Sequence, residues 1–170
     1  MNIIITRIRK TTIALDGRLT IDGKHICDTT ENADCHLPEG RYTIRLDKCR
    51  VRSRIVPLIV SPDSCHDSPL CKRTANKNEK AAMSLIDRLD KCPEEEDLLP
   101  SHPNKLPMPF CPRLAFGNGV CNRTDGAILV GTYRSNGLVI HSKQTFDNLY
   151  ERIRKAVERG RGVTITIHNA

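Results

Sequence analysis

Hydrophobic and polar residues alternate through most of residues 2–60, a pattern typical of strands with one buried face. Alternation runs across residues 13–21, with the pair Asp16-Gly17 in its middle, and Asp22-Gly23 follows before another short run at 25–28. Asp-Gly pairs tolerate positive φ and are typical of tight hairpin turns. We therefore predict a series of β-hairpins, with reversals at both Asp-Gly pairs.

Two more strands are expected before residue 61. Pro38 and Gly40 precede an alternating run over residues 42–46. Because proline fixes φ and glycine permits a turn, this strand should begin in a defined register. Residues 50–60 predict the next strand, in which arginines alternate with apolar residues before a short apolar end.

Two short apolar runs and several turn glycines are concentrated between Cys111 and Ser142. Arg113–Phe116 and Ala127–Tyr133 are bounded by proline or glycine, and they predict buried strands. The loop between them contains Gly117-Asn118-Gly119 and Asp125-Gly126. Such residues allow sharp reversals, so main-chain N–H groups could converge on an anion or an oxyanion. A plain hairpin-like connection is the alternative explanation.

The end of the chain predicts one helix and one last strand. Ser142 is a good N-cap for a helix over Lys143–Arg159, and Gly160 should end it. The expected buried residues of this helix are Phe146, Leu149, Tyr150, Ile153 and Val157. Residues 163–168 alternate and predict a strand that pairs into the sheet begun near residue 3. The predicted fold class is α+β, and mainly β.

Residues 61–110 differ in composition from the rest of the chain and predict an insertion. An amphipathic helix is expected at about Asn78–Lys91, followed by a proline-rich connector over Cys92–Phe110. The connector should be extended and packed on the surface. At 170 residues the chain is most simply a single domain, 1–170, that contains this insertion.

Several segments, taken in order, resemble an uncharacterised family of domains that occurs in gut bacteria and their phages. These segments are Arg18–Glu31, Arg113–Asn118, Thr124–Gly131, His141-Ser142 and Phe146–Tyr150. The family is itself similar to the L,D-transpeptidase (YkuD-like) domains, and Leu37–Ile44 looks like their Thr-Pro-x-Gly-x-Tyr/Phe entry. The resemblance implies an L,D-transpeptidase-like β-sandwich or meander with a C-terminal helix and a final strand.

By this resemblance, the catalytic positions of L,D-transpeptidases fall on two alanines. In that superfamily a cysteine thiolate attacks a peptidoglycan stem-peptide carbonyl, a histidine is the base and backbone N–H groups form the oxyanion hole. The histidine position corresponds to Ala115 and the cysteine position to Ala127. A methyl group can neither transfer a proton nor form an acyl intermediate. The resemblance therefore implies the fold without the reaction.

Three hypotheses for the function follow. The first is a non-catalytic domain that binds a cell-wall peptide, a glycan or a protein partner in a groove. The expected groove residues are Arg113, Asn118, Arg123, Thr124 and Asp125. The second is a peptidoglycan transpeptidase or endopeptidase with relocated catalytic groups, Cys121 acting with His141. The third, a structural part of a phage or secretion particle, rests only on where the family occurs.

Charge and cysteine content change this picture little. With 27 Lys and Arg against 20 Asp and Glu, the net charge of +7 favours anionic partners, but the basic residues are scattered and accompany no nucleic-acid-binding motif. The eight cysteines include no Cys-x-x-Cys pair, so we expect free buried thiols or a few disulfides, and no metal or cofactor. The absence of a signal peptide or long apolar run predicts a cytoplasmic, phage-associated or secretion-associated protein without a membrane span.

Overall fold

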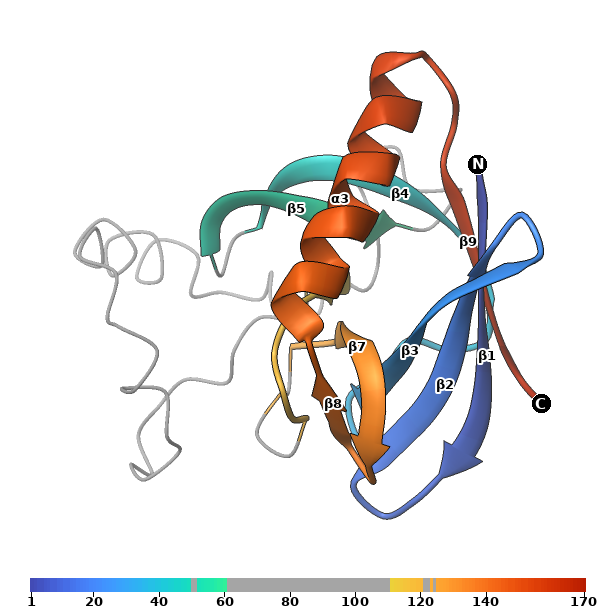
Figure 1. Ribbon diagram of the computed structural model, residues 1–170, viewed down its shortest axis with the longest axis vertical. Coiled ribbons are helices and arrows are strands. Elements are labelled where there is room, and N and C mark those ends of the chain that lie inside the picture. The colour runs from blue at the N-terminus through green and yellow to red at the C-terminus, as the bar shows by residue number, and fades with distance from the viewer. Residues whose placement is uncertain (50–51, 61–110, 121–122, 124) are drawn as a thin grey trace, which may run out of the picture.

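The structure, a computed structural model, describes all residues except 50–51, 61–110, 121–122 and 124 (Figure 1). The predicted insertion, with its helix and proline-rich connector, lies outside the described residues. The elements are β1 (Asn2–Lys10), β2 (Ala14–Ile21), β3 (Lys24–Asn32), β4 (Gly40–Cys49), β5 (Arg52–Val60), β6 (Arg113–Ala115), β7 (Ala127–Ser135), β8 (Leu138–Ile140), α3 (Ser142–Glu158) and β9 (Thr164–Asn169).

One nine-stranded sheet dominates the described part of the chain. Its strand order is β3-β2-β1-β9-β4-β5-β6-β7-β8, and β3 also pairs with β7. This additional pairing brings the sheet round on itself into a barrel-like shape and leaves β8 outside the closure. Helix α3 packs mainly against β7, with further contacts to β5 (Figure 1). The predicted class, α+β and mainly β, is confirmed.

The first three strands form the predicted antiparallel meander, but only one of the two predicted turns exists. Asp22 and Gly23 have φ of 48° and 82° and join β2 to β3. The prediction of a turn at Asp16-Gly17 is wrong, because this pair lies inside β2. Gly17 serves a close approach to β1, since a Cβ there would lie 2.7 Å from the carbonyl oxygen of Thr6.

The two apolar runs of the central stretch form neighbouring strands, though not as a hairpin. Strands β6 and β7 are parallel, with Leu114 opposite Ile128. The hairpin-like alternative is therefore wrong, because parallel neighbours need a crossover connection. The sequence pattern also missed β8, which pairs with the end of β7 after a turn that contains Gly137 at φ 70°.

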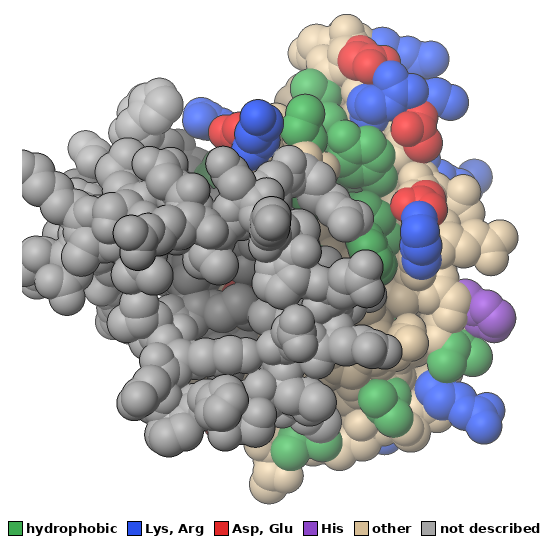
Figure 2. Space-filling view, turned by 90° about the vertical axis from the view of Figure 1, so that its left-hand side faces the viewer, with side chains coloured by type: hydrophobic (Ala, Val, Ile, Leu, Met, Phe, Trp, Pro, Cys, Tyr) green, Lys and Arg blue, Asp and Glu red, His purple; other side chains and the backbone are tan. Residues whose placement is uncertain are grey.

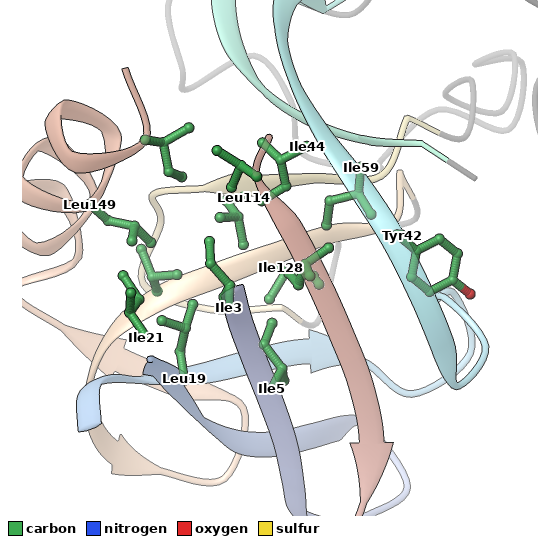
Figure 3. Packing of buried hydrophobic residues seen from close by; sticks show 14 of the residues in the cluster. Ile3, Ile5, Leu19, Ile21, Tyr42, Ile44, Ile59, Leu114, Ile128 and Leu149 are labelled. Atoms are coloured by element: carbon green, nitrogen blue, oxygen red, sulfur yellow. The ribbon is translucent and has the colours of Figure 1, made fainter. Parts of the chain in front are cut away.

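The last strand pairs where the sequence predicts, with Ile165 opposite Ile3 of β1. Strand β9 also pairs with β4, so it joins the N-terminal meander to the second half of the sheet. The main core is built from inward-facing residues of the sheet together with the buried face of α3, and Ile3, Leu114 and Leu149 point toward one another in it (Figure 3). Burial of such aliphatic side chains is the main driving force for this fold.

Helix α3 matches its prediction within one residue at each end, and Gly160 follows it at φ 68°. Its buried face contains Phe146, Leu149, Ile153 and Ala156. Val157, predicted to be buried, is 40% exposed, because Ala156 takes that place on the core side. Acidic and basic side chains alternate along the outer face of the helix (Figure 2). Among the described residues, no helix has the length and apolar character needed to cross a membrane.

Candidate functional site

Ala115 and Ala127 lie on adjacent parallel strands, β6 and β7, and face the same small apolar cluster. Their register is offset by two residues, since Ala115 is opposite Leu129 and Ala127 is opposite Arg113. The cluster consists of Ala14, Ala115, Val120, Ala127, Leu129 and Val139. Ala115 is 8% exposed and Ala127 is 3% exposed. At these two positions the protein presents buried methyl groups to apolar neighbours, so the side chains can contribute packing only.

A buried ion pair lies beside Ala127. Arg113 Nη2 donates to Asp125 Oδ2 at 2.5 Å, and both side chains are 1% exposed. Arg113 Nη1 also donates to the carbonyl oxygen of Cys111, and Asp125 Oδ1 accepts the backbone N–H of Ala127. A buried charge requires such a partner. Arg113 and Asp125 therefore lie inside the protein, which corrects the expectation that they line a surface groove.

The other predicted groove residues differ in their placement. Asn118 is exposed, while Arg123 is half-buried and donates from Nη2 to the carbonyl oxygen of Phe116 at 3.5 Å. Arg123 also packs over Gly117, where a Cβ would lie 2.7 Å from Nη2. Thr124 lies outside the described residues. Asn118 and Arg123 thus remain as the described members of the predicted binding surface.

The loop between β6 and β7 uses several of its N–H groups internally, so it does not form the predicted cradle from them. The N–H of Gly117 donates to Ser142 Oγ at 3.0 Å, and that hydroxyl donates to the carbonyl oxygen of Val130 at 2.5 Å. The N–H of Val120 is bonded to the carbonyl oxygen of Gly137. These groups are already satisfied and are not presented to a ligand.

Ser142 therefore has a different role from the predicted one. Helix α3 begins at Ser142, with His141 as its N-cap residue at φ 53° and no side-chain cap bond. The prediction that Ser142 caps the helix is wrong, because its hydroxyl bridges the Gly117 loop and β7 instead. His141 is exposed at this corner. Its proposed catalytic partner, Cys121, lies outside the described residues, so their pairing stays a prediction.

The structure brings a different thiol close to Ala127. Cys35, in the loop between β3 and β4, has a hydrogen bond with the backbone of Gly126, the residue before Ala127. Burial raises the pKa of the Cys35 thiol; the Gly126 bond lowers it by less, and the Asp125 carboxylate raises it again, so the net direction is upward. A thiol in this environment stays protonated near neutral pH and is a poor nucleophile. Sequence spacing gave no sign of this contact, since it depends on how two distant loops meet.

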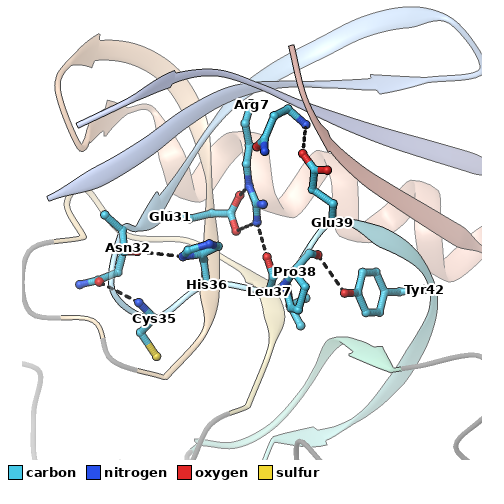
Figure 4. Close-up of polar contacts among 11 residues, drawn as sticks. Arg7, Glu31, Asn32, Cys35, His36, Leu37, Pro38, Glu39 and Tyr42 are labelled. Carbon is cyan, nitrogen blue, oxygen red and sulfur yellow. Dashed lines mark hydrogen bonds and ion pairs between the residues drawn. The ribbon is translucent and has the colours of Figure 1, made fainter. Parts of the chain in front are cut away.

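Buried polar contacts fix the loop that carries Cys35 (Figure 4). Arg7 forms two hydrogen bonds with the Glu31 carboxylate, at 3.0 and 2.9 Å, and a third with the carbonyl oxygen of Leu37. Asn32 Oδ1 accepts the N–H of Cys35 at 3.1 Å. The Arg7–Glu31 pair is almost fully buried, and Arg7 bonds to both Glu31 and the Leu37 carbonyl oxygen. It therefore anchors both ends of this loop.

Within the described ranges, no three His, Cys, Asp or Glu side chains gather as a metal site would require. Comparison of the chain with models of known protein families, with curated proteins and with solved structures gave no match.

Proposed function

We propose that this chain is a non-catalytic domain of the L,D-transpeptidase-like type, which binds a cell-wall peptide or glycan, or a protein partner. The observation that carries the proposal is the burial of Ala115 and Ala127 in one apolar cluster. Covalent acyl transfer needs a nucleophile and a base within hydrogen-bond reach of each other. Two methyl groups supply neither. The residue opposite Ala127, Arg113, is ion-paired with Asp125.

The proposed binding surface lies around the loop from Phe116 to Gly119. Asn118 is exposed there and the Arg123 guanidinium lies against the same loop. Lys143, at the start of α3, has its Nζ 5.7 Å from the centre of the Phe116 ring. Two cations and an amide therefore border this partly exposed segment, and Lys143 also pairs with Asp147 at 2.9 Å on the surface of α3. This arrangement suits a partner that carries carboxylates, such as a cell-wall peptide.

Co-sedimentation with purified peptidoglycan sacculi tests this proposal. The protein should sediment with sacculi, and the double substitution Asn118→Ala with Arg123→Gln should weaken binding at least tenfold. Arg161→Gln is the matched control for the lost charge, because Arg161 is exposed beyond the end of α3. Thermal melts should remain the same for all variants. Wild-type binding by the double variant would contradict the assigned surface, and absence of all binding would favour a protein partner.

The relocated-enzyme hypothesis has one structural observation in its favour, the placement of Cys35 beside Gly126. The raised pKa of that thiol is against it, because the thiolate is the reactive form. Alkylation by iodoacetamide at pH 7.5, followed residue by residue by mass spectrometry, separates the two cases. We expect Cys35 to react more slowly in the folded protein than in the chain unfolded in urea. Faster reaction in the folded state would support an activated cysteine.

A further inference from the structure

A pocket of about 360 Å³ lies among the strands of the N-terminal meander and β7, apart from the cluster around Ala115. Its lining residues are Ile8, Arg9, Asp16, Gly17, Arg18, Asp28 and Tyr133. This volume is at the lower end of the range for pockets that hold small molecules. The lining combines two carboxylates, two guanidinium groups, one aromatic ring and one exposed isoleucine, so it carries both signs of charge in a small space.

Asp16 is the buried carboxylate of this pocket, and it is only 4% exposed. Its Oδ1 accepts the hydroxyl of Thr30 at 2.8 Å and the N–H of Gly137 at 3.2 Å. Its Oδ2 is buried and has no hydrogen-bond partner among the described residues. Buried carboxylate oxygens almost always have a donor. The unsatisfied oxygen on a pocket-lining residue therefore points to a donor from outside the described residues.

Asp28 places a second carboxylate in the same lining. Its Oδ2 accepts the N–H of Tyr133 at 2.8 Å, and its Oδ1 lies 3.3 Å from His25 Nε2. The Asp28 side chain is 21% exposed, which leaves it accessible to a ligand. Because a backbone bond from β7 fixes this carboxylate, it is held in place before any ligand binds.

The two arginines of the pocket have no carboxylate partner of their own among the described residues. Arg9 lies over the ring of Tyr133, with its guanidinium carbon 4.8 Å from the ring centre. Arg18 is exposed and is directly opposite Asp28 in the pairing of β2 with β3. The described ion pairs include neither arginine. Both guanidinium groups are therefore available to an incoming anionic group.

We propose that this pocket binds a small zwitterion, a free α-amino acid. Its primary ammonium donates to Asp16 Oδ2 and to the Asp28 carboxylate, and its carboxylate is held by Arg9 and Arg18. A simple anion fits less well because the two aspartates repel it, and a simple cation fits less well because the two arginines repel it. The ring of Tyr133 and the exposed Ile8 provide apolar surface for the carbon atoms of the ligand.

Titration of the intact protein with the free L- and D-amino acids, one at a time, tests this assignment. We follow the backbone amide resonances of Gly17, Asp28 and Tyr133 by two-dimensional NMR. At least one amino acid should shift these resonances saturably, and its N-acetyl and carboxamide forms should each bind at least tenfold more weakly. Failure of every free amino acid to shift them would overturn the proposal, as would equal binding of the N-acetyl form.

Two variants locate the contacts. Asp16→Asn should weaken binding at least tenfold without lowering the melting temperature, because the amide oxygen can keep both bonds of Oδ1. Asp47→Asn is the matched control, since Asp47 is exposed on β4 and does not line the pocket. Arg18→Gln, with Arg41→Gln as its control, tests the carboxylate end and does not depend on the folding of the Asp16 variant. Wild-type affinity in both pocket variants would overturn the proposed contacts. This test is independent of cell-wall binding around Asn118.

Discussion

The carboxylate of Asp125 holds the Arg113 guanidinium at 2.5 Å inside the protein, beside Ala127 at the start of β7. The same carboxylate accepts the N–H of Ala127. One buried acidic group thus joins β6 to the start of β7 and neutralises the charge next to the apolar cluster. Two of the five expected groove residues, Arg113 and Asp125, are therefore structural parts of the core.

Asp125→Ala is expected to lower the free energy of unfolding by about 3–5 kcal/mol, because it leaves the Arg113 charge buried without its partner. Urea denaturation measures this change. Asp47→Ala is the control, since Asp47 is exposed and its loss should cost less than about 0.5 kcal/mol. Adding Arg113→Met to Asp125→Ala should recover a large part of the loss, as the unpaired charge is then removed. Equal effects of the two single aspartate variants would contradict a structural ion pair.

Ser142→Ala should cost about 1–3 kcal/mol, because it leaves the Gly117 N–H and the Val130 carbonyl oxygen without their bridging hydroxyl. Thermal unfolding, compared with the exposed control Ser135→Ala, measures the difference. If Ser142 acted only as a helix cap, Ser142→Gly would be tolerated to within a few tenths of a kcal/mol. We expect instead that Ser142→Gly destabilises at least as much as Ser142→Ala.

Ala115→His should lower stability by about 1–3 kcal/mol, because an imidazole does not fit among the small apolar neighbours of β6 without displacing them. Thr132→His, at an exposed position of β7, controls for the residue type. Denaturant midpoints of the two variants give the comparison. An Ala115→His protein as stable as the control would mean that room for a histidine exists beside Ala127.

The thiol of Cys27 makes stability depend on alkaline pH. Burial, with a smaller effect of Asp28, raises the pKa of this thiol from about 9 to about 12 in the folded protein. Between these values the unfolded chain loses the proton first, so the folded state binds more protons and loses stability as pH rises. The slope for this group is at most roughly 1.4 kcal/mol per pH unit. Urea denaturation under reducing conditions at pH 8 to 10.5 should show a flatter decline for Cys27→Ala than for wild type.

Sequence periodicity was sufficient for most of the strands and for the C-terminal helix, because their buried faces repeat at regular intervals. It failed at Asp16-Gly17, where a glycine that permits close strand contact has the same sequence signature as a turn. It also missed β8, which has only three residues and shows no clear alternation. Periodicity also does not predict strand direction, because no local sequence pattern distinguishes a parallel β6–β7 pair from a hairpin.

The candidate site was harder to predict than the fold. The sequence predicts Arg113 and Asp125 as groove residues, but exposure depends on strand register, and in the observed register the Arg113 side chain lies in the interior. The contact of Cys35 with Gly126 arises between loops far apart in the chain, and no spacing rule covers it. The Asp16 pocket was missed because its residues come from three strands of a meander and one strand from the other half of the chain.

The most direct test of the non-catalytic proposal is incubation of the purified protein with peptidoglycan sacculi, followed by mass spectrometry of the muropeptides. We expect a muropeptide profile identical to that of untreated sacculi, because buried methyl groups occupy the two positions that the resemblance assigns to the catalytic histidine and cysteine. New cross-linked or released muropeptides would contradict it. Loss of such products in a Cys35→Ala or Cys121→Ala variant would then identify the thiol responsible.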